Sequence, residues 1–123
     1  MAYTIYYNPK CSKCRETLRI MTDKDIEPLI VEYLKDPPSK EELTEIIQKL
    51  NIQPSELIRF KEEKAKELGV YASNDLTLEE WLTILTENPV LIERPIVISA
   101  KGAVIGRPPE NVLELLTQSK SQS

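Results

Sequence analysis

The order of apolar and polar positions predicts a β-α-β unit over the first part of the chain. Thr4 to Tyr7 has the character of a strand, and Asn8-Pro9 ends it with a turn. The pattern from about Ser12 to Asp23 predicts a helix. Pro28 to Tyr33 contains a short apolar run, which is typical of a buried strand in a parallel sheet. We therefore expect a strand, a helix and a second strand parallel to the first.

Helical periodicity without a strand pattern follows from about residue 39 to residue 88. Ser39 with Glu42, and Thr77 with Glu80, have the spacing of capping boxes, in which side chains and backbone N–H groups bond reciprocally at a helix N-terminus. Gly69 is placed to end a charged helix. The sequence predicts helices over about residues 39–50, 54–58, 61–68 and 77–88.

The last part of the chain predicts a hairpin followed by a helix. Ile96 to Ile98 is a β-branched run, Lys101-Gly102 is a turn, and Ala103 to Ile105 is a second strand. The closing helix is expected to begin near Pro108-Pro109, because proline is favoured at the first helical position.

This element order is that of an α/β, thioredoxin-like fold, with a mixed four-stranded sheet and a helical insertion between strands 2 and 3. We expect one domain over residues 1–117, with the insertion at about 39–88, and a polar tail over 118–123. Pro95 directly precedes the third strand. Ordinary statistics favour a trans-proline that starts the strand, but the fold context favours a cis-proline beside the active site.

Composition and charge narrow the functional classes. The chain has 123 residues, which suits one compact domain. Its net charge of -4 argues against general nucleic-acid binding, although a small basic pocket for an oxyanion remains compatible with it. It has no run of about 18 apolar residues, so we expect no membrane span. No signal-peptide pattern is present, so we expect a cytoplasmic protein, and nothing in the surface pattern demands a dimer, so we expect a monomer.

The chain has no histidine and only two cysteines, Cys11 and Cys14. A Cys–His catalytic pair and a His-ligated metal are therefore excluded. Two thiolates alone do not make a zinc site, so we expect no metal and no bound cofactor. A Cys-x-x-Cys motif after a strand in a cytosolic protein indicates thiol redox chemistry instead.

Cys11 stands where the predicted loop enters the first helical turn, and this position favours a reactive thiolate. Free backbone N–H groups and the positive end of the helix dipole stabilise a negative charge there. Lys10, Lys13 and Arg15 add positive charge nearby. We interpret Cys11 as the nucleophile, against the alternative of a buried structural cysteine. Cys14, one turn further on, is either a resolving or regulatory thiol or a small residue without an obligatory role.

Three arginines have local settings that suit oxyanion binding. Arg59 follows a short predicted helix, Arg94 precedes Pro95, and Arg107 precedes two prolines. A tetrahedral oxyanion is well matched by planar, permanently charged donors. For each arginine taken alone, a solvated surface role is the simpler interpretation, and spacing alone does not show that they converge.

Three segments resemble the glutaredoxin-coupled arsenate reductase family, and the similarity extends from Tyr3 to Leu116. The segments are Tyr6-Tyr7-Asn8-Pro9-Lys10-Cys11-Ser12-Lys13-Cys14-Arg15-Glu16-Thr17-Leu18, Glu93-Arg94-Pro95-Ile96-Val97 and Ile105-Gly106-Arg107-Pro108-Pro109-Glu110. The resemblance implies that Cys11 attacks arsenate. It also implies that three arginines hold the oxyanion and its cysteine adduct, namely Arg59, Arg94 and Arg107. Supporting roles fall to Asn8, Lys10, Arg15 and Pro95.

The resemblance also implies the reductants and exposes two departures from the family pattern. Glutathione as co-substrate and glutaredoxin as partner would complete the reduction of arsenate, or of a similar oxyanion. The chain has Tyr7 where well-characterised members carry a histidine, so activation of Cys11 must rely more on the helix terminus and nearby cations. It has Cys14 where many members have serine, which permits an internal disulfide.

Other functions fit parts of the same pattern. Spx-type transcription regulators resemble the same fold, and use Cys-x-x-Cys as a redox switch while binding RNA polymerase, but they lack the motif around Arg107. A general thiol–disulfide oxidoreductase would explain the two cysteines, but it would give the three arginines no function. A reductase of another tetrahedral oxyanion is a third alternative.

Overall fold

The computed structural model of the chain describes residues 2–121, and side chains only as far as residue 116. The chain divides into two compact units. The first unit comprises Met1–Asp36 and Arg94–Ser123, and the second comprises Pro37–Glu93. The second unit includes residues 39–88, where the sequence predicts a helical insertion.

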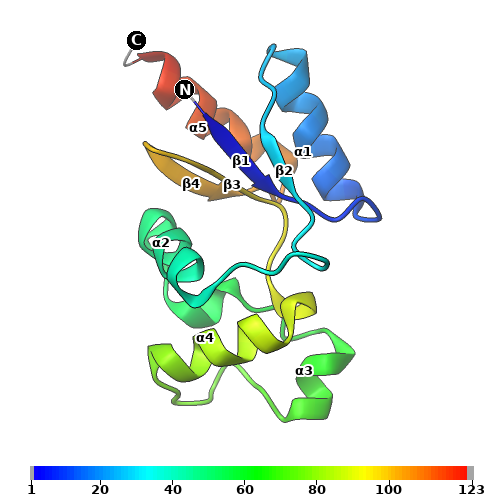
Figure 1. Cartoon of the computed structure of the whole chain (residues 1–123), viewed down its shortest axis with the longest axis vertical. Coiled ribbons are helices and arrows are strands. Elements are labelled where there is room, and N and C mark those ends of the chain that lie inside the picture. The colour runs from blue at the N-terminus through cyan, green and yellow to red at the C-terminus, as the bar shows by residue number, and fades with distance from the viewer. Residues whose placement is uncertain (1, 122–123) are drawn as a thin grey trace. The chain divides into compact units, whose positions relative to one another are not determined.

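The first unit is built on a four-stranded mixed sheet (Figure 1). Its strands are β1 (Tyr3–Tyr6), β2 (Leu29–Val31), β3 (Ile96–Ser99) and β4 (Gly102–Ile105), in the spatial order β2-β1-β3-β4. β1 pairs in parallel with β2, and the other two pairings are antiparallel. The predicted β-α-β unit, hairpin and mixed sheet are therefore confirmed.

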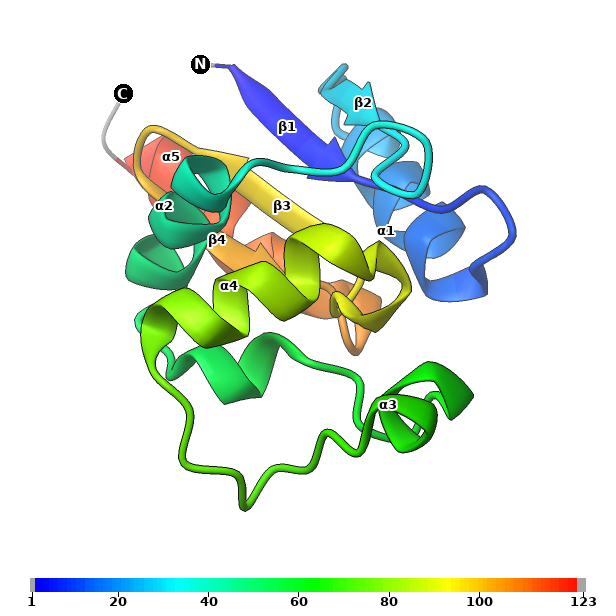
Figure 2. The same ribbon diagram turned by 60° about the horizontal axis from the view of Figure 1, so that its bottom comes forward.

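Two helices pack on one face of this sheet (Figure 2). They are α1 (Ser12–Asp23) and α5 (Val112–Ser121), the latter preceded by the 3₁₀ turn η3 (Pro109–Asn111). Alternate residues of a strand point to the same face, and the buried cluster combines such strand residues with helix residues. Its members are Tyr3, Ile5, Met21, Val97, Val112, Leu115 and Leu116. This core fixes the helix that carries Cys11 against the sheet.

The expectation that the second strand is buried is wrong. β2 lies at the edge of the sheet, where the side chain of Leu29 is 66% exposed and that of Ile30 is 46% exposed. A short apolar run predicts a strand, but its composition does not show whether a neighbour covers each face. The parallel direction of the strand was predicted correctly.

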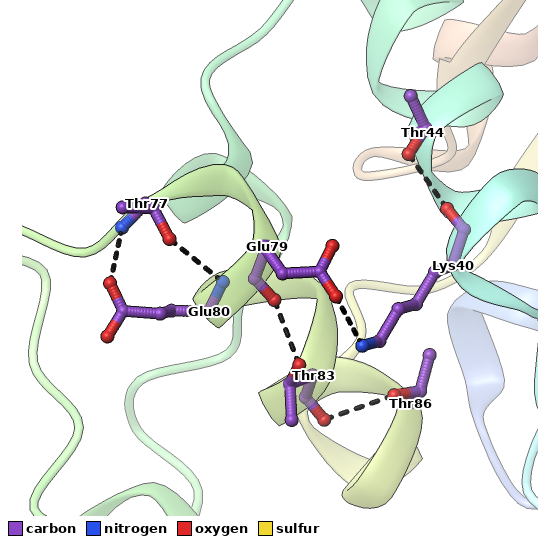
Figure 3. A network of polar contacts seen from close by, with 7 residues as sticks. All are labelled: Lys40, Thr44, Thr77, Glu79, Glu80, Thr83 and Thr86. Carbon is purple, nitrogen blue, oxygen red and sulfur yellow. Dashed lines mark hydrogen bonds and ion pairs between the residues drawn. The ribbon is translucent and has the colours of Figure 1, made fainter.

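The second unit contains five helical segments among the described residues. These are α2 (Lys40–Leu50), η1 (Pro54–Leu57), α3 (Glu63–Leu68), α4 (Leu78–Glu87) and η2 (Pro89–Leu91). Both predicted capping boxes are present, at Ser39 and at Thr77. Figure 3 shows the box at Thr77 and the ion pair of Lys40 with Glu79, 2.6 Å long, which joins α2 to α4. Gly69 ends α3 with a left-handed conformation, as predicted.

α5 continues to Ser121, into the segment predicted as a polar tail, and residues 122–123 lie outside the described residues. The peptide bond before Pro95 is cis, as predicted, and the bond before Pro108 is also cis, which the sequence had not indicated. Over the described residues, no helix is long and apolar enough to cross a lipid bilayer.

Candidate active site

The loop between β1 and α1 is held by hydrogen bonds that its own residues make. The Asn8 carbonyl accepts from the Cys11 N–H at 2.9 Å, and Asn8 Oδ1 accepts from the Lys10 N–H at 3.0 Å. Arg15 Nη1 donates to the Pro9 carbonyl at 2.8 Å, which ties the first helical turn back to the loop. Asn8 and Arg15 therefore shape the loop that presents Cys11.

Cys11 is the N-cap residue of α1, with extended backbone angles. Its sulfur makes no cap hydrogen bond of regular geometry, but it faces the Cys14 N–H and the Arg94 guanidinium. Burial acts to raise the pKa of the thiol. Two influences outweigh burial and hold the pKa of Cys11 below its usual value. They are hydrogen bonding from the Cys14 N–H and thiol, and the hydrogen bond and positive charge of the Arg94 guanidinium. The first turn of α1 contains no acidic residue that would oppose a thiolate.

Cys14 lies one turn along α1 and is fully buried. Burial raises the pKa of its thiol to about 12, and the neighbouring Cys11 sulfur acts in the same direction. Both cysteines are free thiols. Because Cys14 keeps its proton at neutral pH, it serves as a hydrogen-bond donor to the Cys11 thiolate.

Arg94 precedes β3, the strand that pairs with β1, and its side chain acts on Cys11. Tyr6, the last residue of β1, pairs with Ile96 of β3, so Arg94 lies just beyond the end of β1, where the Cys11 loop begins. Its guanidinium contributes both a hydrogen bond and positive charge to the Cys11 sulfur. The cation that lowers the pKa of Cys11 is thus brought by the sheet rather than by the adjacent sequence.

Arg107 follows β4 and donates to two groups of the site. Its Nε donates to the Arg94 carbonyl at 2.7 Å, and its Nη2 donates to the Cys11 sulfur at 3.9 Å. Asn111 holds the backbone of this turn, because its Nδ2 donates to the carbonyls of Arg107 at 3.1 Å and Ile105 at 3.3 Å. Two guanidinium groups therefore converge on one sulfur.

Gly106 allows this turn to approach α1 closely. A Cβ at this position would lie 2.5 Å from Thr17 Oγ1 and 2.8 Å from Pro95 Cγ. The Thr17 hydroxyl is itself fixed, since it donates to the Lys13 carbonyl at 2.8 Å. The absence of a side chain at Gly106 therefore sets the position of Arg107 relative to α1.

Tyr33 brings a fully buried hydroxyl to the same region. The hydroxyl lies close enough to the Arg94 guanidinium for that positive charge to act on its pKa, yet it makes no hydrogen bond of regular geometry. Burial is the main cause that raises the pKa of Tyr33 to about 12. The phenol is therefore neutral at physiological pH.

A cavity of about 360 Å³ adjoins the Cys11 loop, a size in the range of small-molecule sites. Tyr7 and Lys10 line it from the loop, and Glu32, Leu34 and Lys35 line it from the segment after β2. Glu32 and Lys35 form a loose ion pair of 3.7 Å across its wall. The cavity thus combines an apolar surface with two ammonium groups and one carboxylate.

Arg59 belongs to the second unit and makes ion pairs there. Its Nη1 lies 2.8 Å from Glu62 and its Nε lies 3.4 Å from Glu93. Its backbone N–H donates to the Leu91 carbonyl at 2.7 Å. A role for Arg59 beside Cys11 stays a prediction.

Of the residues predicted from the sequence, the first unit brings together Cys11, Cys14, Arg94 and Arg107 around one sulfur. Pro95 is buried beside Gly106, and Lys10 lines the cavity. Sequence reasoning missed Tyr33, Thr17, Gly106 and Asn111. Tyr33 could have been found from its place two residues beyond β2, since parallel strands end at a common edge. The close contact at Gly106 has no sequence signal beyond the glycine itself.

This arrangement suits nucleophilic attack on an anion. A thiolate at Cys11 could act as a nucleophile, and two guanidinium groups could hold oxygen atoms of a tetrahedral oxyanion beside it. Among the residues that the structure describes, no cluster of three or more His, Cys, Asp or Glu side chains could hold a metal ion.

Comparisons with known proteins identify the family of the chain. The family model described as "ArsC family" matches residues 6–115. An arsenate reductase of Haemophilus influenzae is 45% identical over 94% of this chain and 100% of its own length. An arsenate reductase of Escherichia coli K12 is 37% identical over 95% of this chain and 82% of its own length. The solved structure of an arsenate reductase from Vibrio cholerae is 43% identical, covers 93% of this chain and 97% of its own, and superposes with a TM-score of 0.87. The chain belongs to the ArsC family and has its thioredoxin-like fold.

Proposed function

We propose that the protein is an arsenate reductase in which Cys11 is the nucleophile. The observation that carries the proposal is the convergence of Arg94 and Arg107 on the Cys11 sulfur. Relatives that cover nearly the whole chain and are named arsenate reductases add support. Arg59 is proposed as a third oxyanion ligand, by resemblance only.

In the first step, the Cys11 thiolate attacks the arsenic atom of arsenate. A sulfur–arsenic bond forms, and one arsenate oxygen takes up protons from solvent and leaves as water, while arsenic stays As(V). Arg94 and Arg107 offset the negative charge that would otherwise repel the thiolate, and they donate to the remaining oxygens. The lowered pKa of Cys11 increases the fraction of the nucleophile that is ionised near neutral pH.

External thiols then supply the two electrons. The glutathione sulfur displaces a second oxygen as water and binds arsenic. A glutaredoxin thiolate attacks the glutathione sulfur, and the arsenic–sulfur bond breaks with its electron pair left on arsenic, which becomes As(III). The mixed disulfide leaves. Water then cleaves the bond between Cys11 and arsenic, which releases arsenite and restores the thiol. We place this reaction in the cytoplasm, where thiols are kept reduced.

The cavity beside the Cys11 loop supports glutathione as the small thiol. Glutathione carries two carboxylates and one ammonium, and the cavity offers the opposite set: Lys10, Lys35 and Glu32. The apolar surfaces of Tyr7 and Leu34 suit its aliphatic chain. We propose that glutathione occupies this cavity when its sulfur approaches the adduct on Cys11.

The decisive experiment is arsenate-dependent NADPH oxidation with glutathione, glutathione reductase and glutaredoxin supplied. The wild type should turn over, and Cys11→Ser should not, because the hydroxyl is not ionised at neutral pH. Ser12→Ala, a change at an exposed position next to the nucleophile, is the matched control and should retain activity.

Absence of turnover in the wild type, with both thiols confirmed reduced, would exclude the proposed activity. Reduction of insulin disulfides without arsenate would then favour the thiol–disulfide oxidoreductase, which the free Cys11–Cys14 pair makes the second candidate. The similarities reported above lend no support to a transcription regulator, since those relatives are named arsenate reductases.

A further inference from the structure

The Tyr33 hydroxyl is buried next to a charged group without a regular hydrogen bond. A buried hydroxyl without a regular hydrogen bond loses its bonds to water and gains little stability in exchange. Phenylalanine would fill the same space without that loss. Packing alone therefore does not account for a tyrosine at this position.

The register of the sheet brings the segment that carries Tyr33 to the end of β1 from which the Cys11 loop leaves, independently of any charge. Tyr6, at the end of β1, pairs with Val31 on one side and Ile96 on the other. Tyr33 lies two residues beyond Val31, and Arg94 two residues before Ile96. The two residues thus flank the segment that leaves β1 toward Cys11.

A neutral partner suits an arginine whose charge must stay available. A carboxylate beside the guanidinium would orient it but would offset its charge, as Glu62 and Glu93 do for Arg59. A phenol can accept an N–H bond and leave the full positive charge for the thiolate and the oxyanion.

We propose that Tyr33 is a positioning residue whose neutral hydroxyl orients the Arg94 guanidinium toward the Cys11 sulfur and the oxyanion bound there. The part that concerns arsenate rests on the proposed function. The Tyr33 hydroxyl and the Cys11 sulfur both act on Arg94 by hydrogen bonding, so the phenol can hold the guanidinium beside the sulfur.

The test is Tyr33→Phe, with Tyr3→Phe as the control because Tyr3 is also buried but lies at the opposite end of β1. The first readout is the pH profile of Cys11 alkylation by iodoacetamide in Cys14→Ser protein. Tyr33→Phe should shift this profile to higher pH, since a less well held Arg94 stabilises the thiolate less. The KM for arsenate should rise at least about fivefold with a smaller change in kcat. Tyr3→Phe should change neither quantity.

Two further measurements separate positioning from a structural role. The melting temperature of Tyr33→Phe should equal or exceed that of the parent, because the ring that fills the space is kept and only a hydroxyl without a regular hydrogen bond is removed. In an Arg94→Ala background, Tyr33→Phe should cause no further shift of the alkylation profile, since its partner is gone. Three results would each overturn the proposal. They are an unchanged alkylation profile in Tyr33→Phe, an equal shift of that profile in the Arg94→Ala background, and a fall in the melting temperature of Tyr33→Phe. If the wild type does not reduce arsenate, the proposed function fails, and the alkylation profiles still decide the role of Tyr33.

Discussion

Arg107 donates from Nε to the Arg94 carbonyl at 2.7 Å while its Nη2 faces the Cys11 sulfur at 3.9 Å. One arginine is therefore held by the backbone of the other, and the two guanidinium groups act as a linked pair. Their planar forks allow each to serve two acceptors at once, which an ammonium group at the same place would do poorly.

Arg107→Lys should lower kcat/KM for arsenate at least about tenfold, because lysine cannot bridge the Arg94 carbonyl and the oxyanion together. Arg19→Lys, a change at an exposed position of α1, is the matched control and should leave the rate unchanged. Steady-state kinetics of both variants decide the matter, and equal rates for Arg107→Lys and wild type would show that the bridging geometry is dispensable.

Cys14→Ala should raise the pKa of Cys11, because it removes one of the hydrogen bonds that hold that pKa down. Alkylation of Cys11 near neutral pH should slow accordingly. Cys14→Ser keeps a donor and should lie closer to wild type. Full arsenate turnover by Cys14→Ser would make Cys14 auxiliary, whereas loss of turnover would identify it as a resolving thiol.

The free energy of unfolding should fall above about pH 9. The folded-state pKa of Cys14 is about 12, against 9.0 for a free thiol, so between these values the unfolded chain loses a proton that the folded chain keeps. Tyr33, whose pKa rises from 10.0 to about 12, adds to this alkaline loss. Chemical denaturation from pH 8 to 11 should show a shallower decline in Cys14→Ser, and parallel curves would refute the assignment to Cys14.

Gly106→Ala should destabilise the protein by about 1–3 kcal/mol, since the new methyl group overlaps Thr17 and Pro95. It should also lower arsenate reduction by displacing Arg107. Gly102→Ala is a close control, because its Cβ would meet only Leu115 at an ordinary 3.7 Å. Adding Thr17→Ala to Gly106→Ala should restore part of the stability, and thermal melts of the three variants and the wild type would reveal whether it does.

Lys35→Glu should raise the KM for glutathione while the KM for arsenate stays near wild type. The change puts two carboxylates on one wall of the cavity, where they would repel those of glutathione. Lys101→Glu, on the exposed β3–β4 turn, carries the same charge change away from the cavity. If both substitutions affected the glutathione KM equally, long-range charge rather than the cavity would be responsible.

Features set by local sequence were predicted well. The boxes at Ser39 and Thr77 and the glycine that ends α3 depend on residues three or four positions apart, and each is present. Whether β2 is buried depends on the elements that flank it, and the apolar character of Leu29 and Ile30 does not reveal those neighbours. For the same reason the sequence did not indicate a role for Tyr33. This residue comes close to Arg94 only because β2 and β3 are both paired with β1.

The high pKa of Cys14 also affects how long the proposed adduct on Cys11 would last. A thiol that remains protonated attacks slowly, so an adduct on Cys11 is not promptly discharged by its neighbour in the same chain. In the proposed reaction, the lifetime of that adduct is then set by the supply of outside thiols. In a cell this would couple the throughput of the enzyme to the size of the reduced thiol pool, and the reaction would pause, with its intermediate preserved, whenever that pool is depleted.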